Sequence, residues 1–123
     1  MTSAERIRAL WADMDTGNWS TLPSYFTSGA VIIWPNTGER FTPEEFRSVN
    51  AAYPGRWGIT VERLEAGASS VVSVAEVRAK DGFKSFHVVS FFDFDGDSIA
   101  TLTEYWSEDG APPAWRNSML KQV

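Results

Sequence analysis

The second half of the chain constrains the fold most strongly, because it reads as consecutive β-strands without a helical interruption. Strands are predicted over 57–64, 70–79, 83–94 and 99–106. The links between them are short, contain Gly and mostly Asp, and suit antiparallel hairpins. Side-chain alternation places Leu102, Glu104 and Trp106 on one face of the last strand. An unpaired acid on an apolar face is costly to bury, so Glu104 is the first candidate for a functional residue; the alternative is a structural ion pair with Arg78, Arg56 or Arg116.

The first half predicts the helices that would cover such a sheet. Helical spacing of apolar residues begins after Thr2 or Ser3 and ends at Gly17. A second short helix is predicted over 19–26, with Pro23 in its first turn.

A strand and a third helix follow in the sequence. The β-branched run 30–34 predicts the strand. Thr42, Pro43 and Glu45 are typical of a capped helix start, and this helix is expected to end near residue 52. The order of elements predicts an α+β fold of one domain over 1–123, with three N-terminal helices on a curved antiparallel sheet. Long strands twist, so the helices should leave a cone-shaped pocket.

Composition excludes several classes of function. The chain has 123 residues, a net charge of −5 and no cysteine, and its Lys and Arg residues are scattered. This predicts no nucleic-acid partner, no disulfide and no thiolate metal site. No apolar run approaches the roughly 20 residues of a membrane span, and the N-terminus has no signal-like core. We therefore expect a cytoplasmic protein without a membrane partner.

The segment 91–99, an aromatic strand followed by an Asp-Gly turn, and the closing Glu104-Tyr105-Trp106 resemble the NTF2-like superfamily. The SnoaL-like small proteins within it are the most similar. The resemblance implies the cone-shaped fold. It also implies a range of activities: polyketide cyclases, ketosteroid isomerases, dehydratases, epoxide hydrolases and non-catalytic binding or scaffolding proteins.

The resemblance also implies roles for particular residues. Glu104 matches the acid of limonene-epoxide-hydrolase-like members, and Trp34 with Asn36 matches their water-positioning pair. Their Arg-x-Asp pair has its nearest equivalent in Glu76 and Arg78, in reversed order.

Chemistry of the ketosteroid-isomerase type needs a carboxylate base and an oxyanion donor. Glu104 with Tyr53, Tyr105 or His87 would supply these groups.

His87 is the only histidine. It is a candidate acid or base partner for Glu104 or Glu76; the alternative is a hydrogen-bonded sheet histidine with no catalytic role. A single histidine without cysteine predicts no metal site, since such sites need three or four ligands.

The remaining candidates would line the pocket or offer it a polar group: Trp34, Asn36, Asn50, Tyr53, Trp57, Glu76, Arg78 and Trp106. We expect a small hydrophobic, cyclic molecule and no cofactor. The protein is interpreted either as an acid/base enzyme of the isomerase, cyclase or hydrolase type, with Glu104 and His87 as catalytic residues, or as a non-catalytic binding or interaction module.

Two expectations concern exposed apolar surface. Both faces of the strand around His87 carry apolar residues, so a second copy is expected to cover one of them in a homodimer. The segment 110–116 is expected to fold back, because Trp115 would otherwise lie in water.

Overall fold

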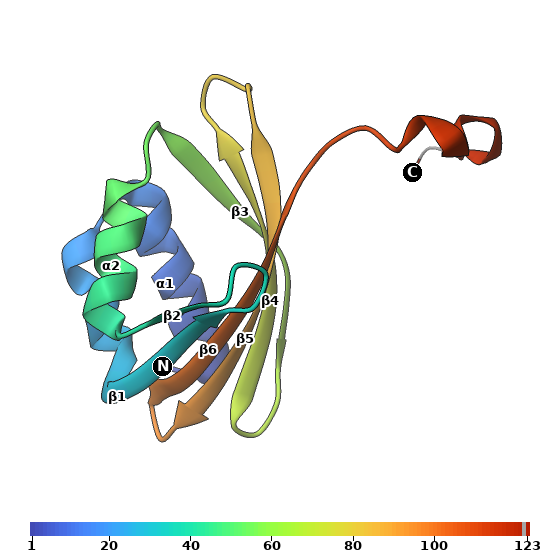
Figure 1. Ribbon diagram of the computed structural model, residues 1–123. Coiled ribbons are helices and arrows are strands. Elements are labelled where there is room, and N and C mark those ends of the chain that lie inside the picture. Colours follow the sequence, from blue (N-terminus) through green and yellow to red (C-terminus); the bar gives the residue numbers. More distant parts are fainter. Residues whose placement is uncertain (122) are drawn as a thin grey trace.

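The computed structural model describes residues 1–121 and 123. Its elements, in chain order, are α1 (Ser3–Thr16), the 3₁₀-helix η1 (Trp19–Tyr25), β1 (Phe26–Trp34), β2 (Glu39–Phe41), α2 (Pro43–Ala52), β3 (Trp57–Ala66), β4 (Ser70–Ala79), β5 (Ser85–Asp95), β6 (Ser98–Glu108) and the 3₁₀-helix η2 (Ala114–Met119). Both α-helices lie on one side of a curved sheet (Figure 1). The predicted α+β fold is confirmed.

The six strands form one sheet in the order β2-β1-β6-β5-β4-β3. Strands β3 to β6 form the predicted antiparallel meander. The expectation of an entirely antiparallel sheet is wrong at one junction, because β1 pairs in parallel with β6. The turn after β1 leads into the short strand β2, which the sequence did not predict and which forms an edge hairpin with β1. Strand β1 also begins at Phe26, four residues earlier than expected.

Both α-helices begin as the sequence predicts. Thr2 and Thr42 accept hydrogen bonds from the backbone N–H groups of Glu5 and Glu45, whose carboxylates bond back to the cap residues. The second helix is wound as a 3₁₀-helix, and Pro23 lies in its second half, not in its first turn.

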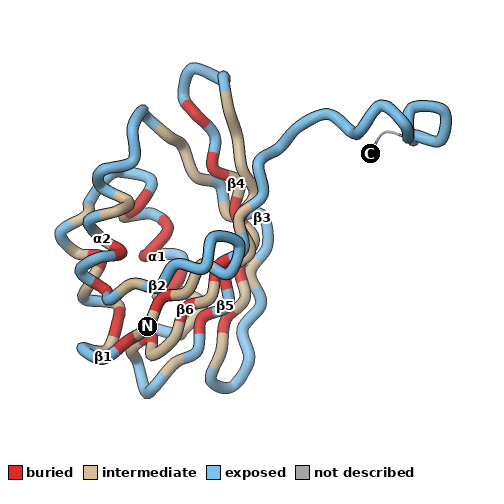
Figure 2. The backbone as a smooth tube through the Cα atoms, viewed as in Figure 1, coloured by how far each residue is buried: buried red, intermediate tan, exposed pale blue. Residues whose placement is uncertain are grey.

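Apolar side chains fill one end of the space between helices and sheet. Buried residues gather where α1 and the other helical segments face the strands (Figure 2). Leu10 and Leu22 from the helical side meet Phe92 and Leu102 from the sheet in this core. Phe92 is fully buried, whereas its neighbour Phe91 points to the opposite face and is 42% exposed.

A row of polar residues crosses the inner face of the sheet within this core. Ser73, Ser90 and Glu104 lie opposite one another on β4, β5 and β6, and all three are buried. The indole N–H of Trp11 donates to Ser73 Oγ at 3.0 Å, and that of Trp34 donates to Glu104 Oε1 at 3.1 Å. These bonds satisfy polar groups that would otherwise be costly to bury.

The expectation that the C-terminal segment folds back is wrong in this structure. The chain leaves the sheet after β6 and runs away from the body (Figure 1), and the Trp115 side chain is 72% exposed. Pro113 adopts φ −57° and ψ 143°, and consecutive prolines hold the chain extended at this point. Among the described residues, no helix has the length and apolar character that a membrane crossing requires.

Candidate functional site

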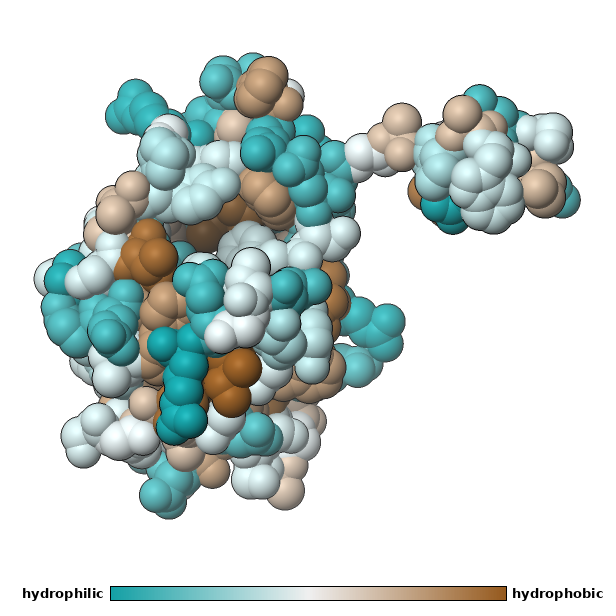
Figure 3. All heavy atoms as spheres, in the orientation of Figure 1, coloured by the Kyte–Doolittle hydropathy of each residue, from teal (hydrophilic) through white to brown (hydrophobic). Residues whose placement is uncertain are grey.

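The open end of the cone holds a cavity of about 890 Å³. It lies between the ends of α1 and α2 on one side and the ends of the strands on the other. Figure 3 shows a hollow on this face of the molecule, with hydrophobic atoms inside it. Its principal lining residues are Trp11, Met14, Asp15, Trp19, Trp34, Asn36, Glu39, Val49, Asn50, Tyr53, Arg56, Trp57, Ile59, Val77, Lys80, Phe86 and Trp106.

Five aromatic side chains form a continuous wall along this cavity. Ring centroids are 6.1 Å apart for Trp34 and Trp106, and 6.1 Å apart for Trp106 and Phe86. The wall continues from Phe86 to Trp57 at 5.7 Å and from Trp57 to Tyr53 at 5.3 Å. Edge contacts of this kind fix the orientation of each ring. The wall therefore presents a preformed aromatic surface built by β1, β6, β5, β3 and the end of α2.

Polar groups at the cavity mainly hold neighbouring backbone in place. Asn36 Oδ1 accepts the backbone N–H of Trp106 at 3.2 Å, and Asp15 Oδ1 accepts that of Ile59 at 2.7 Å. Asn50 Nδ2 donates to the Phe46 carbonyl at 2.8 Å. The first two bonds link separate segments that border the cavity, and the third lies within α2, so these polar residues support the shape of the cavity.

Glu104 is buried behind the aromatic wall. Its carboxylate accepts the Ser90 hydroxyl at 2.6 Å and the Trp34 indole N–H at 3.1 Å. Burial raises the pKa of Glu104 above its usual value, and the two hydrogen bonds oppose that shift without cancelling it. Glu104 is not among the residues that line the cavity, whereas its hydrogen-bond partner Trp34 is. The hydrogen bond therefore connects Glu104 to the cavity wall.

Trp106 carries an unpaired donor. Its Nε1 is the one buried side-chain nitrogen or oxygen without a hydrogen-bond partner in the described part of the chain. Leaving a buried donor unpaired costs about 1–3 kcal/mol. The Trp106 ring lines the cavity, and although its N–H is closed to water in this structure, a small movement of the ring would let a ligand satisfy this donor.

The structure does not bring His87 and Glu104 together, so their expected pairing is wrong. His87 lies on β5 in alternation with Val88 and Ser90, and those two are buried on the inner face with Glu104. His87 points to the outer face of the sheet. Glu76 and Arg78 alternate with buried Ala75 and Val77 on β4, so they also lie outside the cavity. The reason is the two-residue repeat of strands, which separates odd from even positions.

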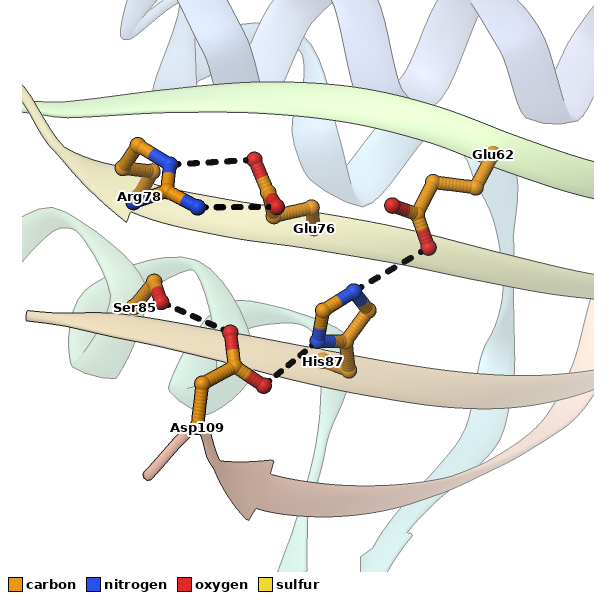
Figure 4. A network of polar contacts seen from close by, with 6 residues as sticks. All are labelled: Glu62, Glu76, Arg78, Ser85, His87 and Asp109. Atoms are coloured by element: carbon orange, nitrogen blue, oxygen red, sulfur yellow. Dashed lines mark hydrogen bonds and ion pairs between the residues drawn. The ribbon is translucent and has the colours of Figure 1, made fainter. Parts of the chain in front are cut away.

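His87 belongs instead to a polar network on the outer face (Figure 4). Its Nδ1 contacts Asp109 Oδ1 at 2.5 Å, and its Nε2 lies 3.1 Å from Glu62 Oε1. Asp109 in turn accepts the Ser85 hydroxyl at 2.7 Å. The bond to Asp109, with a further contribution from Glu62, raises the pKa of His87. Ser85 and His87 lower the pKa of Asp109.

Glu76 and Arg78 form a bidentate pair beside His87, with N–O distances of 3.2 and 3.1 Å. The guanidinium lowers the pKa of Glu76. The predicted substrate-binding role of this pair has no support from its position, since neither side chain lines the cavity.

The structure places six of the predicted substrate-binding residues at the cavity: Trp34, Asn36, Asn50, Tyr53, Trp57 and Trp106. Their binding role stays a prediction. Trp11 and Trp19, which also line the cavity, were not predicted. Trp11 precedes Gly17, the predicted end of the first helix, and Trp19 follows it. This proximity to the helix end was the available sequence signal. Glu62 and Asp109 were missed because their contacts depend on a strand bulge and on the chain after β6.

Comparisons with known proteins agree with this architecture. A family model described as the SnoaL-like domain matches residues 7–102. A proposed ketosteroid isomerase from Kribbella flavida DSM 17836 is 23% identical, with a TM-score of 0.83 over 98% of this chain and 89% of that chain. An NTF2-like protein of unknown function from Burkholderia xenovorans LB400 is 20% identical, with a TM-score of 0.82 over 98% and 94%.

A limonene-epoxide-hydrolase-like protein from M. tuberculosis is 14% identical, with a TM-score of 0.68 over 85% of this chain and 82% of that chain. No curated protein matches the sequence. The matches to solved structures define the class as an α+β domain in which helices pack on one side of a curved sheet. Within this class, the chain belongs to the SnoaL-like domain family. Proteins of this fold have been described as ketosteroid isomerases, polyketide cyclases and epoxide hydrolases.

Proposed function

We propose that the cavity at the open end of the cone binds a small, flat, mainly apolar molecule. The observation that carries the proposal is the continuous aromatic wall from Trp34 to Tyr53 along a cavity of about 890 Å³. A volume of this size suits a ligand of one or a few fused rings. The rings are already positioned by contacts with one another, so binding costs little side-chain ordering.

The ligand should carry an oxygen that accepts a hydrogen bond. The unpaired Trp106 Nε1 is a donor without an acceptor, and an apolar ligand would leave it unpaired. A hydroxyl or carbonyl oxygen on the ligand would accept the hydrogen bond from this donor. The proposed ligand is therefore an oxygenated ring compound.

The position of Glu104 favours binding over catalysis as the primary function. A catalytic acid or base must come within hydrogen-bond reach of the reacting group, and Glu104 is fully buried and does not line the cavity. Glu104 instead accepts the Trp34 N–H and fixes the orientation of that ring. It acts in the proposal as a positioning residue for the cavity wall.

The test is a titration with 2-naphthol, followed by quenching of tryptophan fluorescence and by the melting temperature. Trp34→Ala should weaken binding roughly tenfold or more, because it removes a ring from the wall. Trp115→Ala is the matched control, since Trp115 lies in the exposed C-terminal segment. Equal affinity of the two folded variants, or no binding by the wild type, would reject the proposal. Circular dichroism gives the folded fraction, so affinity is compared per folded molecule.

The oxygen is tested by comparing 2-naphthol with naphthalene. One additional hydrogen bond should make 2-naphthol bind roughly two- to tenfold more tightly. Trp106→Phe should abolish this difference while retaining naphthalene binding. A difference that persists in Trp106→Phe would show that another group recognises the hydroxyl.

Proton-transfer catalysis is a second candidate, favoured by the raised pKa of the buried Glu104. It requires the cavity wall to move so that the carboxyl meets the substrate. Relatives described as a ketosteroid isomerase and an epoxide hydrolase make an unsaturated ketosteroid and a cyclic epoxide the substrates to try first. Turnover by the wild type that Glu104→Gln abolishes without unfolding would support catalysis. Turnover unchanged in Glu104→Gln would remove Glu104 from the mechanism.

A further inference from the structure

Three potential metal ligands converge on the outer face of the sheet, on the side opposite the cavity. One carboxylate oxygen of Glu62, one of Glu76 and one ring nitrogen of His87 all lie within 4.8 Å of one another. They come from three adjacent strands, β3, β4 and β5 (Figure 4). Strand β3 has an irregularity between Val61 and Arg63, and the residue inside it is Glu62. Such bulges redirect a side chain, and here the Glu62 carboxylate reaches His87.

The imidazole is held in the orientation that a metal ligand needs. His87 Nδ1 contacts Asp109, and Asp109 is anchored by the Ser85 hydroxyl. This arrangement leaves Nε2 directed toward Glu62. Histidine ligands in proteins characteristically bind the metal through one nitrogen and a carboxylate through the other. Asp109 is separate from the three converging ligands and provides this second contact.

The distances and charges also suit a cation. Two ligands at about 2.0–2.1 Å from a tetrahedral metal lie about 3.4 Å apart. The His87 Nε2 to Glu62 Oε1 distance of 3.1 Å is close to this value. Three carboxylates, from Glu62, Glu76 and Asp109, outnumber the guanidinium of Arg78 and the imidazole of His87, so the network has an excess of negative charge even when His87 is protonated. The Glu76 carboxylate has enough lone pairs to bind a metal while it retains its hydrogen bonds to Arg78.

The sequence predicted no metal site because it has a single histidine, but the fold brings two carboxylates to that histidine. We propose that Glu62, Glu76 and His87 form a zinc-binding site on the outer face, with Asp109 as the positioning residue for His87. One imidazole and two carboxylates suit Zn²⁺, which accepts nitrogen and oxygen ligands in a tetrahedral arrangement. Water completes the fourth position. Mg²⁺ and Ca²⁺ prefer six or more oxygen ligands, which this site does not offer. The bound ion would tie β3, β4 and β5 together and, through Asp109, would fix the start of the C-terminal segment.

The test is a calorimetric titration of the chelator-treated, full-length protein with ZnCl₂ in a buffer that does not bind metals. The wild type should bind one Zn²⁺ per chain and melt at a higher temperature with Zn²⁺. Glu62→Gln and His87→Gln should each weaken binding at least tenfold. Both side chains are partly exposed, so these variants should fold. Glu65→Gln is the matched control, because Glu65 is an exposed β3 carboxylate paired with Arg63, outside the site.

Asp109→Asn separates a positioning role from a structural one. It should reduce Zn²⁺ affinity about 10- to 100-fold, which is the usual effect of losing a carboxylate behind a histidine ligand. Co²⁺ provides a spectroscopic check, since tetrahedral Co²⁺ absorbs strongly in visible light and octahedral Co²⁺ does not. No Zn²⁺ binding by the wild type, or equal affinity of Glu62→Gln, His87→Gln and Glu65→Gln, would overturn the proposal. The network would then consist of ion pairs alone.

Discussion

The two faces of the same sheet place carboxylates in opposite environments and shift their pKa values in opposite directions. On the inner face, Glu104 is buried and bonded only to the neutral donors of Ser90 and Trp34. The outer face gathers Glu62, Glu76 and Asp109 around His87 and Arg78 in partial contact with water. Burial raises the pKa of Glu104, whereas hydrogen bonds and cationic partners lower that of Glu76 and Asp109. The side of the strand on which an acid lies therefore decides its chemistry.

The largest expected effect that tests this contrast concerns the neighbours Phe91 and Phe92. Phe92→Ala should lower the free energy of unfolding by about 3–5 kcal/mol, because Phe92 is fully buried in the core. Phe91→Ala should cost about 1 kcal/mol or less, since Phe91 is 42% exposed and contacts mainly Tyr105 across the strands. Urea unfolding of both variants measures the difference.

If the two variants lost similar amounts of unfolding free energy, the contrast between the two faces would not hold. Such a result would indicate that something covers the outer face. The homodimer expected from the sequence stays a prediction, and it would have this effect. Phe91 and Tyr105 border a shallow apolar depression on that face, together with Val89 and Thr103. Sedimentation at micromolar concentration determines whether the protein is a homodimer. A 13.7 kDa particle is a monomer, and the outer face would then be free.

A smaller effect is expected from Glu104→Gln as a function of pH. The folded protein favours the protonated Glu104, so its contribution to stability is present below the unfolded pKa of 4.5. That contribution is lost as pH rises through the raised folded pKa. Relative to Glu104→Gln, the wild type should thus lose up to about 1.4 kcal/mol per pH unit between those two pKa values.

Urea unfolding of both proteins between pH 4 and pH 8 measures this difference, and effects of other titrating groups cancel. A difference that does not vary with pH would contradict the raised pKa. A Gln variant less stable at every pH would instead show that the Ser90 and Trp34 hydrogen bonds need a carboxylate.

The smallest effect is expected at His87. In metal-free protein, NMR titration of the imidazole should give a pKa above 6.5, and Asp109→Asn should move it back toward that value. The stability that His87 contributes is present below pH 6.5 and is lost as pH rises through the folded pKa. It should be less than about 1 kcal/mol, because the side chain is partly exposed. A pKa unchanged by Asp109→Asn would refute the assigned cause.

The sequence predicts the fold well because its signals are local. Capping residues mark both α-helices, and Gly-containing turns separate the strands of the meander. The parallel pairing of β1 with β6 was missed, because it joins segments about seventy residues apart with no local signal.

The site was only partly predictable for a related reason. Alternation placed Glu104 and Trp106 on one face correctly. It could not show that Glu104 bonds to Trp34 and does not line the cavity, because that depends on packing between strands. Applied along β5, the same alternation already separates His87 from the inner face.

The row of Ser73, Ser90 and Glu104 crosses the inner face of the sheet, with buried apolar residues on both sides of it and the aromatic cavity beyond them. Apolar packing at one end maintains the fold, and the aromatic cavity at the other end is free to vary. Substitutions of a cavity residue outside the core cluster, such as Val49, can alter the shape of the opening while leaving the apolar core intact. A scaffold of this kind can acquire a new ligand preference by small steps, each of which preserves a folded protein. Directed evolution for altered binding should therefore concentrate beyond this row, on the side of the opening.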